Sequence, residues 1–130
     1  MATMHVEVVS AERQLLSADI AELYARSTEG EIGILPGHQP ALIALDIAPV
    51  TIRHEDGSEE QFAVHNGFLF VDRHKVIVLA DIAERSEQID IERAEYRKSD
   101  VERRLGDEED AVLRSSLRKQ QVRLQVAGRG

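Results

Sequence analysis

The chain has 130 residues, no cysteine and a formal net charge of −8, so it can bury one modest hydrophobic core but cannot form disulfides, thiolate metal sites or a cysteine nucleophile. Residues 1–83 carry 13 acidic and 5 basic side chains, whereas residues 84–130 carry 11 of each, and an acidic first part with few lysines argues against a nucleic-acid partner. No apolar run approaches the roughly 18 residues of a membrane-spanning helix, so we expect no direct membrane span.

The first forty residues predict strands and one well-defined turn. Residues 5–8 alternate between polar and apolar side chains, which is typical of a half-buried strand. The stretch Gly30–Pro40 is rich in glycine. Because Pro36 restricts φ to about −65° and Gly37 tolerates a positive φ, residues 35–38 are predicted to form a type II turn between two extended segments. The stretch lacks the Gly-Lys-Ser/Thr ending of a phosphate-binding loop, and no helix is predicted after it.

Residues 48–83 predict further short strands. The segments 50–53 and 61–64 alternate between apolar and polar residues, and an Asp-Gly pair at 56–57 predicts a hairpin turn between them. The segments 68–71 and 76–79 are apolar throughout, and we expect both to be covered on both faces. Many short strands at this spacing predict a two-sheet β-sandwich.

After residue 86 the apolar residues recur with the period of a helix. The first helical face comprises Ile91, Ala94, Lys98, Val101 and Leu105, and the second comprises Leu113, Leu117, Gln120 and Leu124. Asp90 is predicted to cap the first helix, and Gly106 and Asp107 are predicted to end it. The second helix is predicted to begin within residues 107–110 and to end among the basic residues Arg118, Lys119 and Arg123.

The sequence therefore predicts two domains. Residues 1–86 are expected to form an all-β sandwich, and residues 87–130 an antiparallel α-helical hairpin that follows it. The apolar stripe of each helix is narrow, so the hairpin is expected to be only weakly stable by itself.

An enzymatic function has little support in the sequence. His38 has the densest glycine setting of the histidines, but no serine nucleophile is recognisably placed with it, and the histidines lie singly on separate predicted segments. The acidic residues 107–110 lack the spaced oxygen ligands of a calcium loop. We therefore predict no catalytic residue and no metal site.

Two alternatives from other functional classes stay open. A small hydrolase would lose pH-dependent turnover when His38 is changed. A free-standing β-sandwich that binds a carbohydrate or another small ligand would need an aromatic platform, and the chain has no tryptophan and only the tyrosines Tyr24 and Tyr96.

Four blocks of the sequence resemble the epsilon subunit of F-type ATP synthases, which is called delta in mitochondria. They lie at residues 30–40, 66–71, 76–81 and 89–94 and follow one another in the order and spacing of that family. The last block reads Ile-Asp-Ile-Glu-Arg-Ala and matches the family's Ile/Leu-Asp-x-x-Arg-Ala element. The resemblance is close over the larger part of the chain and looser in the remainder.

The resemblance implies a non-catalytic rotor subunit in the central stalk of a proton-translocating ATP synthase. Its partners would be the gamma subunit, the c-ring and, when the hairpin is extended, the catalytic alpha and beta subunits. It would be a peripheral protein on the cytoplasmic face of the bacterial membrane, and its mobile hairpin would inhibit ATP hydrolysis. Glu31 and His38 would contact partners near the c-ring.

The basic residues of the second helix have two interpretations. The resemblance implies that Arg114, Arg118, Lys119 and Arg123 engage acidic segments of the catalytic subunits. From the residues alone, these side chains form a solvated basic face.

The resemblance also implies ATP as a regulatory ligand, with no cofactor required. The implied nucleotide-binding residues are Glu84, Asp90, Arg93, Ala94, Lys119 and Arg123. Lys119 stands where the family has an arginine, and lysine keeps the positive charge but loses the planar fork that makes bidentate phosphate contacts. Two interpretations of the Asp90–Ala94 element stay open, namely part of an ATP site or a structural helix cap.

Overall fold

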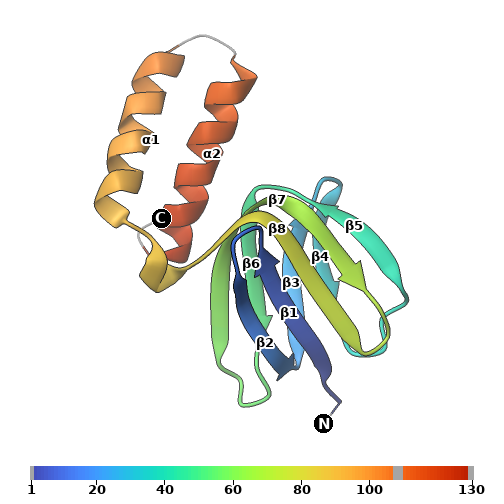
Figure 1. Ribbon diagram of the computed structural model, residues 1–130. Coiled ribbons are helices and arrows are strands. Elements are labelled where there is room, and N and C mark those ends of the chain that lie inside the picture. The colour runs from blue at the N-terminus through green and yellow to red at the C-terminus, as the bar shows by residue number, and fades with distance from the viewer. Residues whose placement is uncertain (1, 107–109, 129–130) are drawn as a thin grey trace.

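A β-sandwich carries a two-helix hairpin at one end in the computed structural model, which describes residues 2–106 and 110–128 (Figure 1). The strands are β1 Met4–Ser10, β2 Gln14–Ile20, β3 Glu22–Ser27, β4 Gly30–Ile34, β5 Ala41–Leu45, β6 Ala48–Arg53, β7 Glu59–Val71 and β8 Lys75–Arg85. A short 3-10 helix, η1 Ser86–Gln88, leads into α1 Ile91–Leu105 and α2 Ala111–Val126. The predicted fold class is confirmed, and the predicted domain boundary after residue 86 falls inside η1.

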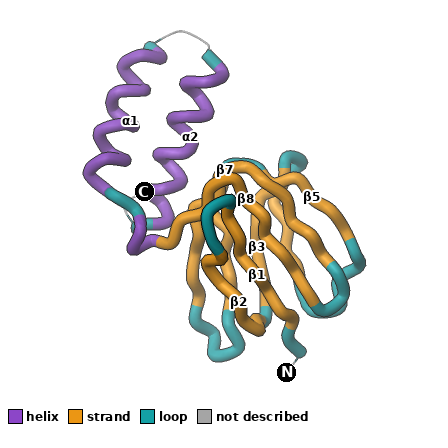
Figure 2. Tube along the Cα trace, in the orientation of Figure 1, coloured by secondary structure: helices purple, strands orange, loops and turns teal. Residues whose placement is uncertain are grey.

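The strands pair in the order β2-β1-β8-β7-β5-β3-β4, and β6 joins β3 to β7. Only the β1–β8 pair is parallel among the described pairings. The alternation predicted from the sequence is confirmed, because Val6, Val8, Ile52, Phe62 and Val64 all lie in the core between the two layers. Figure 2 shows how the strands wrap around this core and leave the helices outside it.

The strands β7 and β8 are long and belong to both layers of the sandwich. The inward side chains of β7 are Phe62 and Val64 before Gly67 but Leu69 and Val71 after it, so the inward set changes from even to odd positions. Gly67 has φ 141°, and a Cβ atom there would lie 2.2 Å from the backbone oxygen of Leu79. Only glycine allows the two strands to approach so closely at this point.

One prediction about these strands was wrong. The apolar segments 68–71 and 76–79 are covered on one face only, since Phe68, Phe70 and Leu79 are 47%, 42% and 43% exposed. The sandwich has a single layer behind these strands and nothing in the described residues in front of them. The outward apolar side chains therefore lie on the surface of the isolated chain.

Both predicted turns are confirmed. His38 N–H donates to Leu35 O at 3.1 Å and Gly37 has φ 85°, as a type II turn requires. The Asp-Gly pair lies in the hairpin between β6 and β7, where Gly57 N–H donates to His54 O at 3.0 Å and Gly57 has φ 87°.

The helical hairpin begins and ends close to the predicted residues. Asp90 caps α1 by accepting the Arg93 N–H at 3.0 Å, and α1 ends before Gly106, as predicted. Residues 107–109, where the second helix was predicted to begin, lie outside the described residues. Asp110 caps α2. The helix α2 continues to Val126, beyond the predicted end near Arg123, because Val126 packs against the sandwich.

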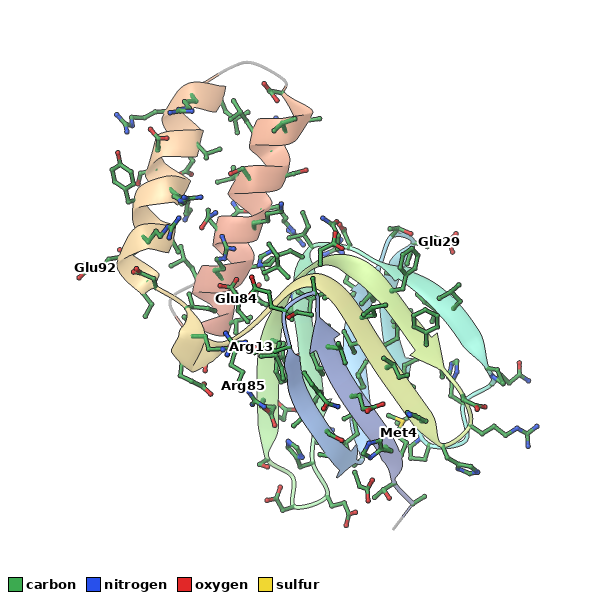
Figure 3. The ribbon with its side chains drawn as sticks, viewed as in Figure 1. Met4, Arg13, Glu29, Glu84, Arg85 and Glu92 are labelled. Atoms are coloured by element: carbon green, nitrogen blue, oxygen red, sulfur yellow. The ribbon has the colours of Figure 1, made fainter. Side chains whose placement is uncertain are left out.

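The hairpin contacts the sandwich mainly through the last turns of α2. A small apolar cluster made of Ile47, Ala63, Ile89, Val122 and Val126 joins α2 to the strands β6 and β7. Arg85, labelled in Figure 3, anchors the end of β8 just before the linker, because its guanidinium donates to Glu60 at 2.6 Å and to Leu15 O. No helix in the described part of the chain is long and apolar enough to cross a membrane.

Candidate functional site

A cleft of about 260 Å³ lies where the end of β8, the start of α1 and the middle of α2 meet. Its walls are Glu84, Gln88, Asp90, Arg93, Arg97, Gln120 and Arg123. The structure thus brings together four of the six predicted nucleotide-binding residues, from segments that are far apart in the sequence. Of the other two, Ala94 is buried at the start of α1 and is not a wall of this cleft.

Glu84 is the centre of the polar contacts in this cleft and lies where the hairpin meets the sandwich (Figure 3). Its Oε1 accepts a hydrogen bond from His65 Nε2 at 3.1 Å. The same oxygen accepts a hydrogen bond from Arg123 Nε at 2.7 Å and forms an ion pair with that guanidinium group. Burial acts to raise the pKa of Glu84, but the hydrogen bonds from His65 and Arg123 outweigh it and hold that pKa below its usual value. The charged carboxylate therefore ties α2 to β8.

Three further cleft residues were not predicted from the sequence, namely Gln88, Arg97 and Gln120. Arg97 follows Arg93 by one helical turn, so the two guanidinium groups share one face of α1. In the sequence, Gln120 is one member of the second helical face. It is 2% exposed, and its Oε1 has no hydrogen-bond partner in the described residues. The helical spacing from Arg93 was the signal that would have found Arg97.

A second cleft, of about 540 Å³, adjoins the first and holds the sixth predicted residue, Lys119. The two clefts share Arg97, Gln120 and Arg123, and the second adds the apolar side chains of Ile82 and Val112. Within the described residues, the side chains of Arg93, Arg97 and Lys119 form no hydrogen bond or ion pair. The combined cleft therefore carries three cations whose charge is not neutralised by a direct partner.

The predicted partner-contact residues are spread over the molecule. Glu31, on β4, lines a cleft of about 460 Å³ together with Arg118. His38 is half-buried and lies beside the β7–β8 turn, since the neighbouring Gly37 N–H donates to Arg73 O at 3.0 Å. The structure does not bring Glu31 and His38 together.

Two of the four basic residues of α2 contact the sandwich. Arg118 Nε donates to Ile47 O at 3.0 Å, and Arg123 pairs with Glu84 as described above. Arg114 is exposed on the first turns of α2. In this conformation the basic helix face is therefore partly used to hold the hairpin against the strands.

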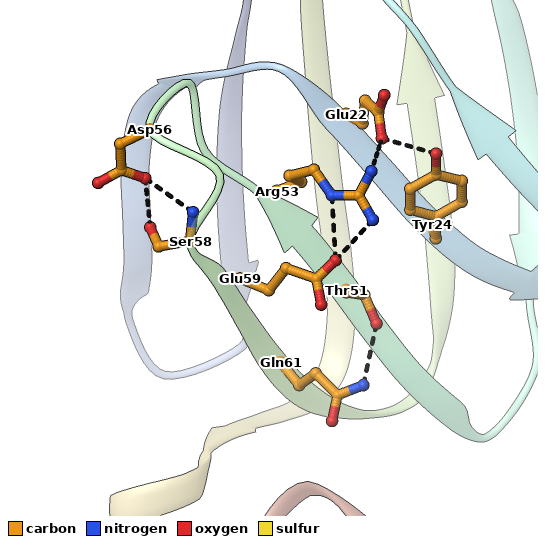
Figure 4. Close-up of polar contacts among 8 residues, drawn as sticks. All are labelled: Glu22, Tyr24, Thr51, Arg53, Asp56, Ser58, Glu59 and Gln61. Atoms are coloured by element: carbon orange, nitrogen blue, oxygen red, sulfur yellow. Dashed lines mark hydrogen bonds and ion pairs between the residues drawn. The ribbon is translucent and has the colours of Figure 1, made fainter.

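A separate polar network covers the outer surface of β3, β6 and β7 (Figure 4). Arg53 bridges Glu22 and Glu59 at 2.8 Å each, and the hydroxyl of Tyr24 donates to Glu22 at 2.7 Å. These side chains satisfy one another, and such exposed ion pairs contribute little to stability. The network is a structural feature of the sheet surface.

The outward apolar side chains of β5, β7 and β8 form one continuous patch, which we call the apolar face. It consists of Leu42, Phe68, Phe70 and Leu79. Leu42 pairs across the strands with Phe70, and Phe68 pairs with Leu79, so the four side chains are immediate neighbours. Contiguous exposed apolar side chains are typical of interaction surfaces.

Comparison with known proteins gives consistent matches. Residues 3–86 match the family model of the ATP synthase delta/epsilon chain, β-sandwich domain. The ATP synthase epsilon chain of Moorella thermoacetica is 39% identical over 132 residues and 98% of each chain is covered. That of Streptomyces avermitilis is 48% identical over 94 residues, which covers 72% of this chain and 76% of the relative.

Solved structures share the whole fold. A chain of the Euglena gracilis mitochondrial ATP synthase superimposes with a TM-score of 0.75 at 21% identity, covering 99% of this chain and 79% of that one. A chain from the central stalk and c-ring of the Tetrahymena thermophila enzyme superimposes with a TM-score of 0.65 at 17% identity, covering 99% and 98%. The sandwich and the hairpin therefore occur together in other proteins.

Proposed function

Because the chain belongs to the delta/epsilon chain family of ATP synthases, we propose that it is the epsilon subunit of a bacterial enzyme and works in its central stalk. The subunit is non-catalytic. Its sandwich links the gamma subunit to the membrane c-ring, and its hairpin regulates ATP hydrolysis. It acts at the cytoplasmic face of the membrane as a peripheral part of the proton-translocating complex.

The observation that carries this proposal is the apolar face. Phe68, Phe70, Leu79 and Leu42 stand on a rigid sheet and are exposed in the isolated chain. A carbohydrate would need polar groups beside the rings to fix its hydroxyls, whereas the hollow next to Phe68 is lined mostly by apolar surface and the backbone of Gly67. A protein partner, the gamma subunit, fits such a flat apolar surface better.

The end of the sandwich that lies opposite the hairpin supports the proposed contact with the c-ring. The type II turn at residues 35–38 packs beside the β7–β8 turn, at the end of the sandwich opposite the hairpin (Figure 1). His38 lies at this end. A stalk subunit whose hairpin points to the catalytic head would present this end to the c-ring.

The narrow contact between hairpin and sandwich supports a mobile brake. Among the described residues, α2 is held in place by one cluster of five apolar residues, by one hydrogen bond from the Arg118 side chain to the backbone oxygen of Ile47, and by the ion pair between Glu84 and Arg123. Exchange between docked and extended hairpins then costs only a few kcal/mol, which is about the range that partner or ligand binding can supply.

The combined cleft supports ATP as the regulatory ligand. Arg93, Arg97 and Lys119, whose side chains have no partner among residues 2–106 and 110–128, suit a polyphosphate. Ile82 and Val112 offer an apolar wall for a base. Because the cleft walls come from both β8 and the two helices, a ligand there would hold the hairpin in its docked position.

Disruption of the apolar face tests the stalk assignment. Phe70→Glu should abolish co-purification of the chain with its gamma subunit, because it places a charge in the centre of the proposed interface. The isolated variant should keep a melting temperature close to that of the parent, since Phe70 is 42% exposed and does not belong to the core cluster. Tyr96→Glu, at an exposed position on α1, is the matched control. Normal assembly of the Phe70→Glu variant would refute the role given to this face.

A further inference from the structure

Three polar side chains are buried in the described part of the chain, and only one of them is fully paired. Ser27, in the sandwich, donates to Gly30 O at 2.8 Å and accepts the Glu29 N–H at 3.1 Å. His65 and Gln120, which are 1% and 2% exposed, each leave one buried atom without a hydrogen-bond partner in the described residues. Buried polar atoms almost always have partners, so these two need an explanation.

Gln120 lies in the seam between the two helices. Residues 120 and 122 are about 200° apart around an α-helix, and Val122 packs against the sandwich. Gln120 is therefore on the opposite face of α2, together with the buried Leu124, and α1 is the element that covers this face. Neither the oxygen nor the nitrogen of the Gln120 side chain forms a hydrogen bond in the described residues. Reversing the amide would therefore leave a buried nitrogen unpaired in place of the oxygen.

The second unpaired atom lies on the other face of α2. Val64 points into the core of the sandwich, so its neighbour His65 faces outward with Ala63, which α2 covers. The Nε2 of His65 is bonded to Glu84 at 3.1 Å, and its Nδ1 has no partner in the described residues. Detachment of α2 from the sandwich would give this Nδ1 access to water, and separation of α1 from α2 would do the same for the Gln120 amide.

We propose that Gln120 is a built-in destabilising residue that keeps the closed helical hairpin close to opening. A buried amide without a partner raises the free energy of the closed seam, and this cost disappears when the helices separate and water reaches the amide. A single polar residue in the apolar seam of a coiled coil lowers stability in the same way. The inference deepens the proposed regulation by a mobile hairpin, and its consequence for ATP hydrolysis rests on that proposal.

The first test is a gain of stability when the native polar group is removed. Methionine is unbranched and favours helices as glutamine does, but its side chain is apolar. Gln120→Met should slow the amide exchange of residues 98–105 in the isolated full chain by about five- to 150-fold, the range expected when one unsatisfied buried group is removed. Gln121→Met, at the exposed neighbouring position, is the matched control and should leave this exchange unchanged.

A second apolar variant makes the result independent of how well one side chain fits. Gln120→Leu should slow the exchange of residues 98–105 in the same direction as Gln120→Met. The exchange of the sandwich residues 62–64 should stay the same in both variants, because Gln120 makes no contribution to that core. Unchanged or faster exchange of residues 98–105 in both variants would overturn the inference, since the amide would then not destabilise the closed hairpin.

Hydrolysis by the assembled complex separates this inference from the proposed brake. Gln120→Met should raise ATP hydrolysis relative to the parent and to Gln121→Met, because a more stable closed hairpin extends toward the catalytic subunits less often. Slower exchange with unchanged hydrolysis would refute the proposed brake and leave the destabilising role of Gln120 standing. Exchange that does not slow would refute that role and leave the proposed brake untouched.

Discussion

Glu84 is the residue on which the docked position of the hairpin most depends. Its carboxylate belongs to β8, one of its hydrogen-bond donors to β7 and the other to α2. His65 is 1% exposed in this arrangement. Undocking would therefore expose a buried histidine and separate an ion pair at the same time, so one side chain couples the two events.

The lowered pKa of Glu84 predicts how docking depends on pH. A carboxylate with a depressed pKa stabilises the docked state above its ordinary value of 4.5, and this stabilisation is lost as the pH falls through the lower, docked value. Glu84→Gln should weaken docking at pH 7 by about 1–2 kcal/mol and flatten the acid dependence. Amide exchange of residues 122–126 measures both effects.

The matched control is Glu92→Gln, because Glu92 is exposed on α1 and forms no hydrogen bond or ion pair within the described residues. It should leave the exchange of residues 122–126 unchanged at every pH. The same acid dependence in the parent and in Glu84→Gln would show that other carboxylates control docking.

At the scale of elements, the sandwich and the hairpin depend on each other unequally. The core of the sandwich is formed by residues of its own two layers. The apolar side chains at the end of α2 are instead buried partly against Ile47 and Ala63 of the sandwich. The sandwich should therefore fold without the helices, and the helices should be poorly protected without the sandwich.

Deletion of residues 89–130 tests this division. The strands should keep slow amide exchange and assembly into the complex should persist. ATP hydrolysis by the complex should rise if the hairpin acts as the proposed brake. A chain ending at Ala127 keeps both helices and should behave as the parent. Loss of assembly in the longer deletion would place the essential interface in the hairpin.

The sequence predicted those elements whose pattern arises within the chain itself. The alternation at Val6 and Val8 predicts a strand with one buried face. Asp90 can cap a helix through its own side chain, whatever the rest of the protein does. The apolar segment 68–71 was misjudged because a strand covered by its own protein and a strand covered by a partner have the same composition. Gln120 was not predicted as a cleft residue because the spacing of residues on a helix does not show which polar side chains are buried.

For the whole molecule, the proposed brake would use the basic residues of α2 in two ways. In the docked state, Arg118 and Arg123 hold α2 against the sandwich. In an extended state, all four basic residues of α2 would be available to acidic segments of the catalytic subunits. An extended arm of about 35 helical residues would reach roughly 50 Å, far enough to pass from stalk to catalytic head.

Replacement of all four basic residues of α2 by alanine distinguishes charge from shape. The change removes docking contacts, so the hairpin should undock more readily, yet inhibition of hydrolysis should fall because the attraction to acidic partners is lost. Hydrolysis assays of the assembled complex measure this, and inhibition by the parent should weaken with added salt. The paired control is Arg103→Ala with Arg104→Ala on α1. Stronger inhibition by the fourfold variant would mean that shape alone makes the brake.

The change of inward positions at Gly67 has a consequence for insertions and deletions. The same two strands present the apolar face on one side of Gly67 and the hairpin contacts Ala63 and Glu84 on the other. Loss of one residue between His65 and Phe68 would shift the frame of everything beyond it, turning the phenylalanines inward and Leu69 outward. The length of this segment is therefore fixed by two interfaces at once, whereas the turns at 54–58 and 72–75 can vary without moving either surface.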